Sequence, residues 1–133
     1  MEGSFLDNLI ERFYPKSSEK IREVLATNFL LEKLATSVYT KLDNYMQQYA
    51  DINSRIISLV HISQDWQKGA YRTISYRNIS IGIFVLMYFA NPYDFIPDFI
   101  PFIGKKDDDY FVKKGLVYLD EEIEKYNKWK AHK

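Results

Sequence analysis

The chain carries apolar residues every three or four positions over a stretch from Lys16 to Lys68 that contains neither glycine nor proline. This spacing predicts helices with one buried stripe. The stripe contains Ile21, Val24, Leu31, Ala35, Val38, Leu42, Tyr45, Tyr49, Ile52, Ile56, Leu59 and Trp66. A single helix over this stretch would be about 70 Å long, well beyond the usual helix length. We therefore predict a break at residues 50–54, which include three good capping residues, and a second helix from about Ser54 to Lys68.

Two arrangements bury such a stripe. The first is the core of a helical bundle formed within one chain, and this is the arrangement we expect. The alternative is a coiled-coil arm through which residues 21–49 pair two copies of the chain into a homo-oligomer.

The most apolar run of the chain extends from Ile79 to Ala90 and is apolar on every side. A helix of this kind belongs at the centre of a bundle. It would be about 18 Å long, whereas the hydrocarbon core of a bilayer is about 30 Å thick, so it is too short to cross a membrane by itself. Gly69 is expected to end the preceding helix, and Pro92 prevents this one from continuing.

The ends of the chain also have helical patterns. A short helix is predicted from Ser4 to about Phe13, before Pro15. From Asp107 onward apolar residues again recur with helical spacing, opposite many lysines and glutamates. No segment alternates with the period of a strand. We predict an all-α fold: one domain over residues 1–133, a compact helical bundle of about four to five helices with a proline-rich irregular motif between the last two.

Composition limits the function classes. The absence of cysteine excludes disulfides, thiolate metal sites and cysteine nucleophiles. Eighteen bases and eighteen acids cancel, so the chain has no long-range attraction for polyanions, and we do not expect a nucleic acid as its partner. The first residues do not resemble an export signal. We expect a cytoplasmic protein, with peripheral attachment to the inner face of the membrane as a further option.

The segment from residue 88 to residue 104 has a composition that suits neither a helix nor a strand. It reads Tyr-Phe-Ala-Asn-Pro-Tyr-Asp-Phe-Ile-Pro-Asp-Phe-Ile-Pro-Phe-Ile-Gly and is followed by Lys-Lys-Asp-Asp. Its prolines predict a stiff turn structure rather than a regular element. The residues that define this motif are Tyr88, Asn91, Pro92, Pro97, Pro101 and Gly104.

This motif resembles the signature of the YkvA-like family, a domain of unknown function. The family pattern runs from a tyrosine-ended apolar helix through Asp-Leu-Ile-Pro-Asp-x-Ile-Pro to Gly-x-x-Asp-Asp. The resemblance extends over about residues 55–130, whereas residues 1–54 resemble no family that we can name. The chain departs from the pattern at Phe95, where leucine is more frequent, and at Lys105-Lys106, which follow the motif glycine.

Four aspartates of the motif, Asp94, Asp98, Asp107 and Asp108, are expected to lie in one region because the flanking helices should pack antiparallel. Carboxylates gathered in this way favour a hard divalent cation, Mg²⁺ or Ca²⁺. The alternatives are that the aspartates form turns and cap the last helix, which we consider the stronger reading, or that they act as catalytic carboxylates. No nucleophile or phosphate-binding loop accompanies them.

The apolar side of the motif suggests a binding role. Phe95, Phe99 and Phe102 are candidates for contact with a protein partner or a membrane surface. We therefore expect non-catalytic binding, and the alternative is a cation-binding protein or cation-dependent enzyme centred on the aspartates. A separate group of bases, Lys68, Arg72 and Arg77, alternates with aromatic residues. It either holds phosphate groups or forms ion pairs with the acids at 120–122.

Overall fold

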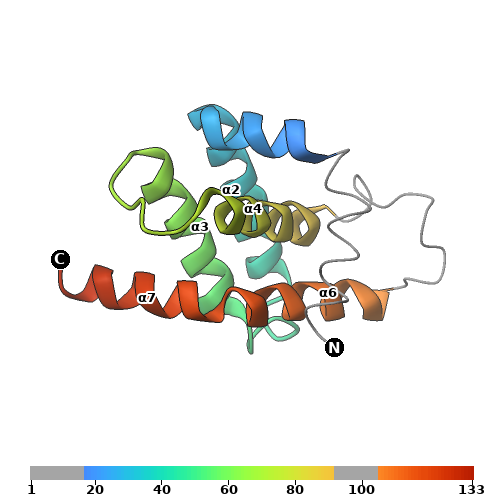
Figure 1. Cartoon of the computed structure of the whole chain (residues 1–133). Helices are drawn as coiled ribbons and strands as arrows, with labels where there is room; N and C mark the ends of the chain where they lie inside the picture. Colours follow the sequence, from blue (N-terminus) through green and yellow to red (C-terminus); the bar gives the residue numbers. More distant parts are fainter. Residues whose placement is uncertain (1–16, 92–104) are drawn as a thin grey trace.

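A computed structural model describes residues 17–91 and 105–133, and within residues 105–110 it describes the backbone alone. These ranges contain six helical segments and no strand (Figure 1). The segments are 17–26, α2 (Asn28–Asn44), α3 (Asn53–Gln67), α4 (Tyr76–Ala90), α6 (Lys105–Tyr118) and α7 (Asp120–Ala131). The all-α prediction is confirmed, but the expected number of four to five helices was too low. The predicted helix at 4–13 and the motif at 92–104 lie outside the described residues.

One additional segment results from a break at Thr27, whose backbone is extended (φ −126°, ψ 110°). The break leaves helix-end carbonyls without partners in their own helix. The side chain of Gln67 from α3 bonds to them, donating Nε2 to the carbonyls of Val24 and Leu25 at 3.1 and 3.0 Å. Asn28 in turn donates to Oε1 of Gln67 at 3.1 Å. A residue about forty positions further along the chain therefore closes the end of this first helix.

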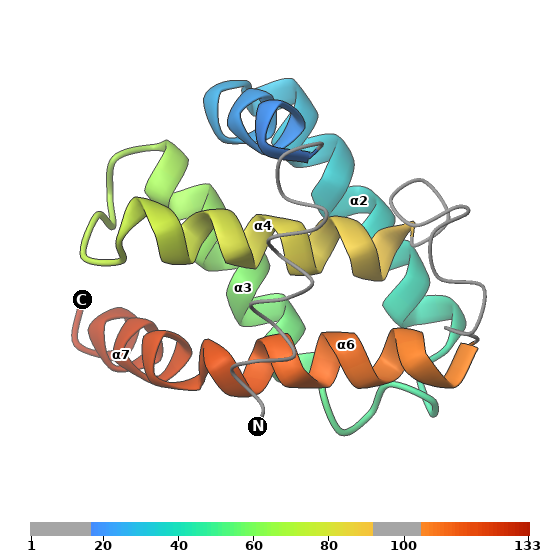
Figure 2. The same ribbon diagram turned by 45° about the vertical axis from the view of Figure 1, so that its right-hand side comes forward.

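The other additional segment results from Leu119, which separates α6 from α7. Its backbone (φ −93°, ψ 6°) departs from helical geometry, while its side chain is fully buried. The hydrogen bonds on both sides persist, since Leu119 N donates to Gly115 O and Ile123 N donates to Leu119 O. The predicted last helix is thus two helices that follow one another along one side of the bundle (Figures 1 and 2).

The predicted break before the second helix is confirmed, although its position differs from the prediction. The chain forms turns from Tyr45 to Ile52, and α3 begins at Asn53. The turns begin earlier than expected, which places Tyr45 outside the helix and leaves it 52% exposed. Trp66, also assigned to the stripe, is half-buried. The other stripe residues are buried in the chain's own core. Self-association through residues 21–49 stays a prediction and would have to use their exposed side, where Phe29 and Met46 lie.

The central position of α4 is confirmed. Every residue from Ile79 to Phe89 is buried, and α4 packs against α2, α3 and α6 (Figure 2). This placement explains why the run is apolar on all sides, because no face of the helix reaches water. Among the described helices, none combines the length and apolar character needed to cross a membrane.

The helices α4 and α6 pack against each other and run in opposite directions (Figure 2). The bundle therefore has two distinct ends along α4. At the motif end, α4 stops at Ala90 and α6 starts at Lys105. At the connector end, α3 stops at Gln67, residues 68–75 connect it to α4, and α7 packs against α3.

Candidate functional site

Aromatic packing joins the two helices that flank the motif. The ring of Phe111 on α6 lies 4.5 Å from the ring of Tyr88 and 5.8 Å from that of Phe84, measured between centroids. All three residues are buried. Tyr88, which we predicted as part of the motif, is therefore a core residue through which the last turn of α4 contacts α6.

A glycine sets the close approach of the same helices. A Cβ atom built on Gly115 of α6 would lie 2.5 Å from Cγ2 of Val85 on α4, closer than real Cβ contacts. The valine is β-branched and its methyl group cannot swing away freely. Only glycine at position 115 allows the two helices to approach this closely.

The C-terminus of α4 receives a lysine from α2. Nζ of Lys41 donates to the carbonyl of Phe89 at 2.7 Å and lies 4.9 Å from the centre of the Phe89 ring. The ring of Tyr49 packs edge-on against that of Phe89 at 4.9 Å. A cation at this position complements the negative end of the helix dipole and satisfies a carbonyl that the helix leaves unpaired. The last turn of α4 is therefore held from two sides.

The structure describes only part of the predicted site. Asn91 follows α4 directly, is exposed, and donates its backbone N–H to the carbonyl of Met87. Asp107 and Asp108 lie in the first turn of α6. The remaining predicted residues lie outside the described ranges: Pro92, Asp94, Phe95, Pro97, Asp98, Phe99, Pro101, Phe102 and Gly104. Within the described ranges no group of three potential metal ligands occurs, so the gathering of the four aspartates stays a prediction.

At the connector end, α3 stops in a Schellman motif. Gly69 has a positive φ of 81°, its N–H donates to the carbonyl of Trp66 at 3.0 Å, and the N–H of Ala70 donates to the carbonyl of Asp65 at 2.9 Å. Only glycine adopts this backbone conformation without strain. The predicted role of Gly69 as the end of the helix is confirmed.

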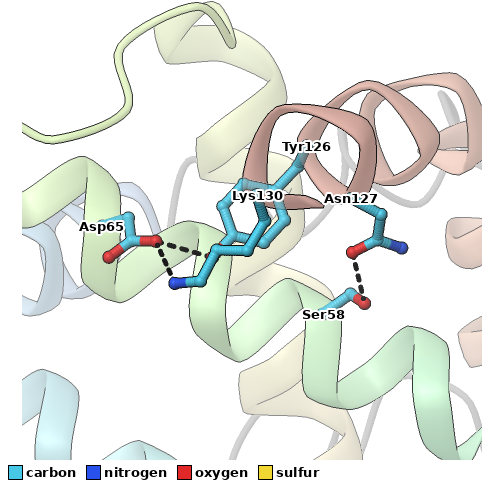
Figure 3. A network of polar contacts seen from close by, with 5 residues as sticks. All are labelled: Ser58, Asp65, Tyr126, Asn127 and Lys130. Atoms are coloured by element: carbon cyan, nitrogen blue, oxygen red, sulfur yellow. Dashed lines mark hydrogen bonds and ion pairs between the residues drawn. The ribbon is translucent and has the colours of Figure 1, made fainter. Parts of the chain in front are cut away.

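The side chain of Asp65 ties α3 to α7 (Figure 3). Its Oδ2 accepts a hydrogen bond from the hydroxyl of Tyr126 at 2.6 Å and one from Nζ of Lys130 at 3.2 Å. Asp65 and Tyr126 are both buried. A second contact between these helices joins Ser58 Oγ to Asn127 Oδ1 at 3.2 Å. A buried carboxylate is tolerated here because a phenol and an ammonium group both bind it.

The electrostatics of this network keep its protons fixed near neutral pH. Burial and the hydrogen bond to Asp65 raise the pKa of Tyr126 to about 12. Burial acts to raise the pKa of Asp65, but the hydrogen bonds from Tyr126 and Lys130 outweigh it and hold that pKa below its usual value. The hydrogen bond to Asp65 also raises the pKa of Lys130. None of the three groups is placed to exchange a proton near pH 7, so the network is suited to holding α7 in place rather than to acid–base catalysis.

Aromatic rings pack around this network. The ring of Tyr71 from the connector lies 5.1 Å from that of Tyr126 and 4.9 Å from that of Trp129. Tyr71 is buried and Trp129 is partly buried. The connector is therefore packed against α7, although it has no regular structure of its own.

Comparison with known proteins gives one result at the motif. A family model described as "Protein of unknown function (DUF1232)" matches residues 79–110. The match covers most of α4, the segment after it and the beginning of α6, which is a shorter part of the chain than the 55–130 of our own resemblance. No curated protein and no solved structure was found to match. The matched residues include the motif end, and the function of the matched family is uncharacterised.

Sequence reasoning did not identify the Asp65 network. A signal was present, because Asp65 is an acid that immediately precedes a residue of the apolar stripe, Trp66, in a helix otherwise assigned to the core. Its partners Tyr126 and Lys130 lie one helical turn apart on α7. The distance of about sixty residues between acid and partners concealed the relation.

Proposed function

We propose that this protein is a non-catalytic binding protein that engages a protein partner or a membrane surface through residues 92–104. The observation that supports this is the antiparallel packing of α4 and α6, which brings both ends of the segment to the motif end of the bundle (Figure 2). The segment would then be a binding surface whose two ends are attached to tightly packed helices. The domain family matched over residues 79–110 covers this same region.

The rigidity of the helices that flank the segment matters for binding. Phe111 against Tyr88 and Lys41 on the carbonyl of Phe89 hold the last turn of α4 to its neighbours, and Gly115 against Val85 brings α6 close to α4 one turn earlier. A binding segment with fixed ends loses less conformational entropy when it meets its partner. Of the residues between these ends, Phe95, Phe99 and Phe102 have the apolar character expected of contacts to a protein or to the bilayer surface. We include in this proposal that the chain is a YkvA-like protein, on the basis of its resemblance to the motif of that family.

The alternative function is divalent-cation binding, or a cation-dependent activity, at Asp94, Asp98, Asp107 and Asp108. The antiparallel helices favour it as well, because Asp107 and Asp108 lie in the first turn of α6, at the end where α4 stops. Oxygen ligands of this type suit Mg²⁺ or Ca²⁺. A cation would offset the mutual repulsion of the carboxylates.

The binding proposal is tested with the triple variant Phe95→Ser, Phe99→Ser, Phe102→Ser. A matched control, Phe29→Ser with Met46→Ser, removes apolar side chains that are 72% and 65% exposed on α2 and the turn after it. Sedimentation with phosphatidylcholine vesicles measures membrane binding, and quantitative capture from a cell extract measures protein binding. The proposal requires that one of these is lost in the triple variant and retained in the control. If the triple variant binds as the wild type does in both assays, residues 92–104 are not the binding surface.

The cation alternative is tested by calorimetric titration with Mg²⁺, Ca²⁺ and Mn²⁺. Heat of binding that disappears in Asp94→Asn and Asp98→Asn, but not in the control Asp43→Asn on the exposed side of α2, supports a cation site. No heat in the wild type, with a lower melting temperature in the two motif variants, supports aspartates that form turns.

A further inference from the structure

The connector end carries bases that are not neutralised by acids. Lys68 and Arg72 are exposed, and in the part of the chain that the structure describes neither lies within ion-pair distance of a carboxylate. Other lysines of the described ranges do have such partners: Lys113 pairs with Asp51 and Lys128 with Glu124. The positive charge of the connector is thus directed to the solvent rather than used within the fold.

Arg72 is held in place by contacts that leave its charge uncompensated. Its Nε donates to the carbonyl of Trp66 at 2.7 Å, and its guanidinium carbon lies 4.2 Å from the centre of the Trp66 ring. These contacts order the side chain through one nitrogen and one face. Its terminal nitrogens make no hydrogen bond to the described residues. These nitrogens are the donors with which arginine binds phosphate in a bidentate manner.

Aromatic side chains lie beside these bases. The ring of Tyr76 is 6.0 Å from that of Trp66, and Tyr76 is 49% exposed although it begins the most buried helix of the molecule. Nη1 of Arg77 donates to the hydroxyl of Tyr118, which is itself 37% exposed. We call the group of Trp66, Lys68, Arg72, Tyr76, Arg77 and Tyr118 the connector surface. Tyrosine and tryptophan favour positions at the boundary between water and an apolar phase.

The start of α4 adds to the positive character of this surface. Helix N-termini carry a partial positive charge and usually have acids in the first turn, but the first turn of α4 has none and includes Arg77. Of the acids bonded to this end, Asp65 is bound by Tyr126 and Lys130. Glu122 accepts a hydrogen bond from the amide of Asn78 at 2.8 Å and Glu32 one from the amide of Gln64 at 3.1 Å, and both keep their negative charge. In the described part of the chain, the exposed bases of this end that lack a carboxylate within ion-pair distance are therefore Lys68 and Arg72.

We propose that the connector surface docks on the anionic headgroups of a membrane. Headgroup phosphates match the forked donors of Arg72, and the exposed tyrosines suit the interfacial region. The neutral chain gives no attraction at a distance, so docking depends on these local bases and weakens as salt screens them. The site lies at the opposite end of α4 from the motif, so it is independent of the function proposed above (Figure 2).

The test compares two triple variants of the full chain. Lys68→Gln, Arg72→Gln, Arg77→Gln removes the bases of the connector surface. Lys20→Gln, Arg22→Gln, Arg55→Gln removes the same charge from the helix at 17–26 and the start of α3. Sedimentation uses vesicles of phosphatidylcholine alone and of an equimolar mixture with phosphatidylglycerol. Circular dichroism and urea unfolding verify that each variant folds.

The wild type is expected to bind the mixed vesicles and to release them at high salt. Each base near the surface contributes about fivefold to partitioning, so the connector variant should lose roughly a hundredfold and the control far less. A wild type that stays in the supernatant, or equal losses in both variants, would overturn the proposal. A wild type that binds a single-stranded oligonucleotide but does not bind vesicles would also overturn it.

Two further measurements distinguish membrane docking by the connector surface from binding of free phosphate and from membrane contact at the motif end. Inorganic phosphate that binds the wild type in the absence of vesicles, with no vesicle binding, would assign the surface to free phosphate and would contradict membrane docking. Loss of vesicle binding in the Phe95, Phe99 and Phe102 variant, with full binding by the connector variant, would place the membrane contact at the motif end. The failure of one proposal can thus be recognised without reference to the other.

Discussion

The contact between α3 and α7 at the connector end and the contact between α4 and α6 towards the motif end are stabilised in different ways. At the connector end, a buried acid, a phenol and a lysine join α3 to α7 through hydrogen bonds. At the motif end, the described contacts between α4 and α6 are steric and aromatic, with Gly115 against Val85 and Phe111 against Tyr88. Directional hydrogen bonds fix which residues meet, whereas close packing fixes how near two helices come. The two ends should therefore respond to different substitutions.

The largest effect is expected from Asp65→Ala at the connector end. The change leaves the buried hydroxyl of Tyr126 without an acceptor and removes the partner of Lys130. Loss of such a charged hydrogen-bond acceptor should lower the free energy of unfolding by about 3 kcal/mol. Urea unfolding measures this, and hydrogen exchange should show faster exchange in α7 than in α6.

Asp43→Ala serves as the control, because Asp43 is an exposed acid on α2. Its removal should change the free energy of unfolding by less than about 0.5 kcal/mol. Equal losses in the two variants would mean that the network adds nothing specific to the connector end.

Tyr126→Phe tests the same network through pH. At pH 7 the variant loses one hydrogen bond to a carboxylate, about 2 kcal/mol. The pKa of Tyr126 is about 12 in the folded protein and 10 without the fold. Because the folded pKa is the higher one, its contribution to stability is complete below pH 10 and declines as the pH rises towards 12. The gap between wild type and variant should therefore narrow over that interval.

Urea unfolding at several pH values between 7 and 12 measures this gap. Tyr45→Phe, at an exposed position, should follow the wild type throughout. A gap that stays constant up to pH 12 would contradict the role assigned to the Tyr126 hydroxyl.

Gly115→Ala tests the packing at the motif end. The new methyl group would collide with Val85, and overpacking of this kind should cost roughly 1.5 kcal/mol after the gain in helix propensity. Gly82→Ala is the matched control within α4, because its Cβ would meet Leu59 and Leu119 at 3.4 and 3.9 Å. It should be neutral or stabilise the protein by about 0.5 kcal/mol. A Gly115→Ala variant as stable as the wild type would contradict the close contact between α4 and α6 at position 115.

The comparison of prediction and structure shows which features of the fold can be predicted from local sequence signals. Apolar residues on every side predicted the central helix α4, and Gly69 correctly predicted the end of α3, because both signals are local. The break at Thr27 was missed because the group that satisfies the free carbonyls is Gln67, far along the chain. The break at Leu119 was missed because its buried leucine continues the helical pattern. Of the candidate site, the sequence placed Asp107 and Asp108 in the first turn of the helix that follows the motif. It missed Asp65, whose role depends on a tertiary contact.

The smallest effect concerns the start of α4, which belongs to the connector end. Ser75 is the N-cap of α4, and its hydroxyl accepts a hydrogen bond from the backbone N–H of Asn78 at 3.1 Å. Ser75→Ala should cost about 1 kcal/mol in the free energy of unfolding. Thr27 is the N-cap of α2 but makes no such bond, so Thr27→Ala should change stability by less than about 0.5 kcal/mol. If the two variants lost the same stability, the cap would contribute nothing to α4, and the burial of its apolar residues alone would set where the helix begins.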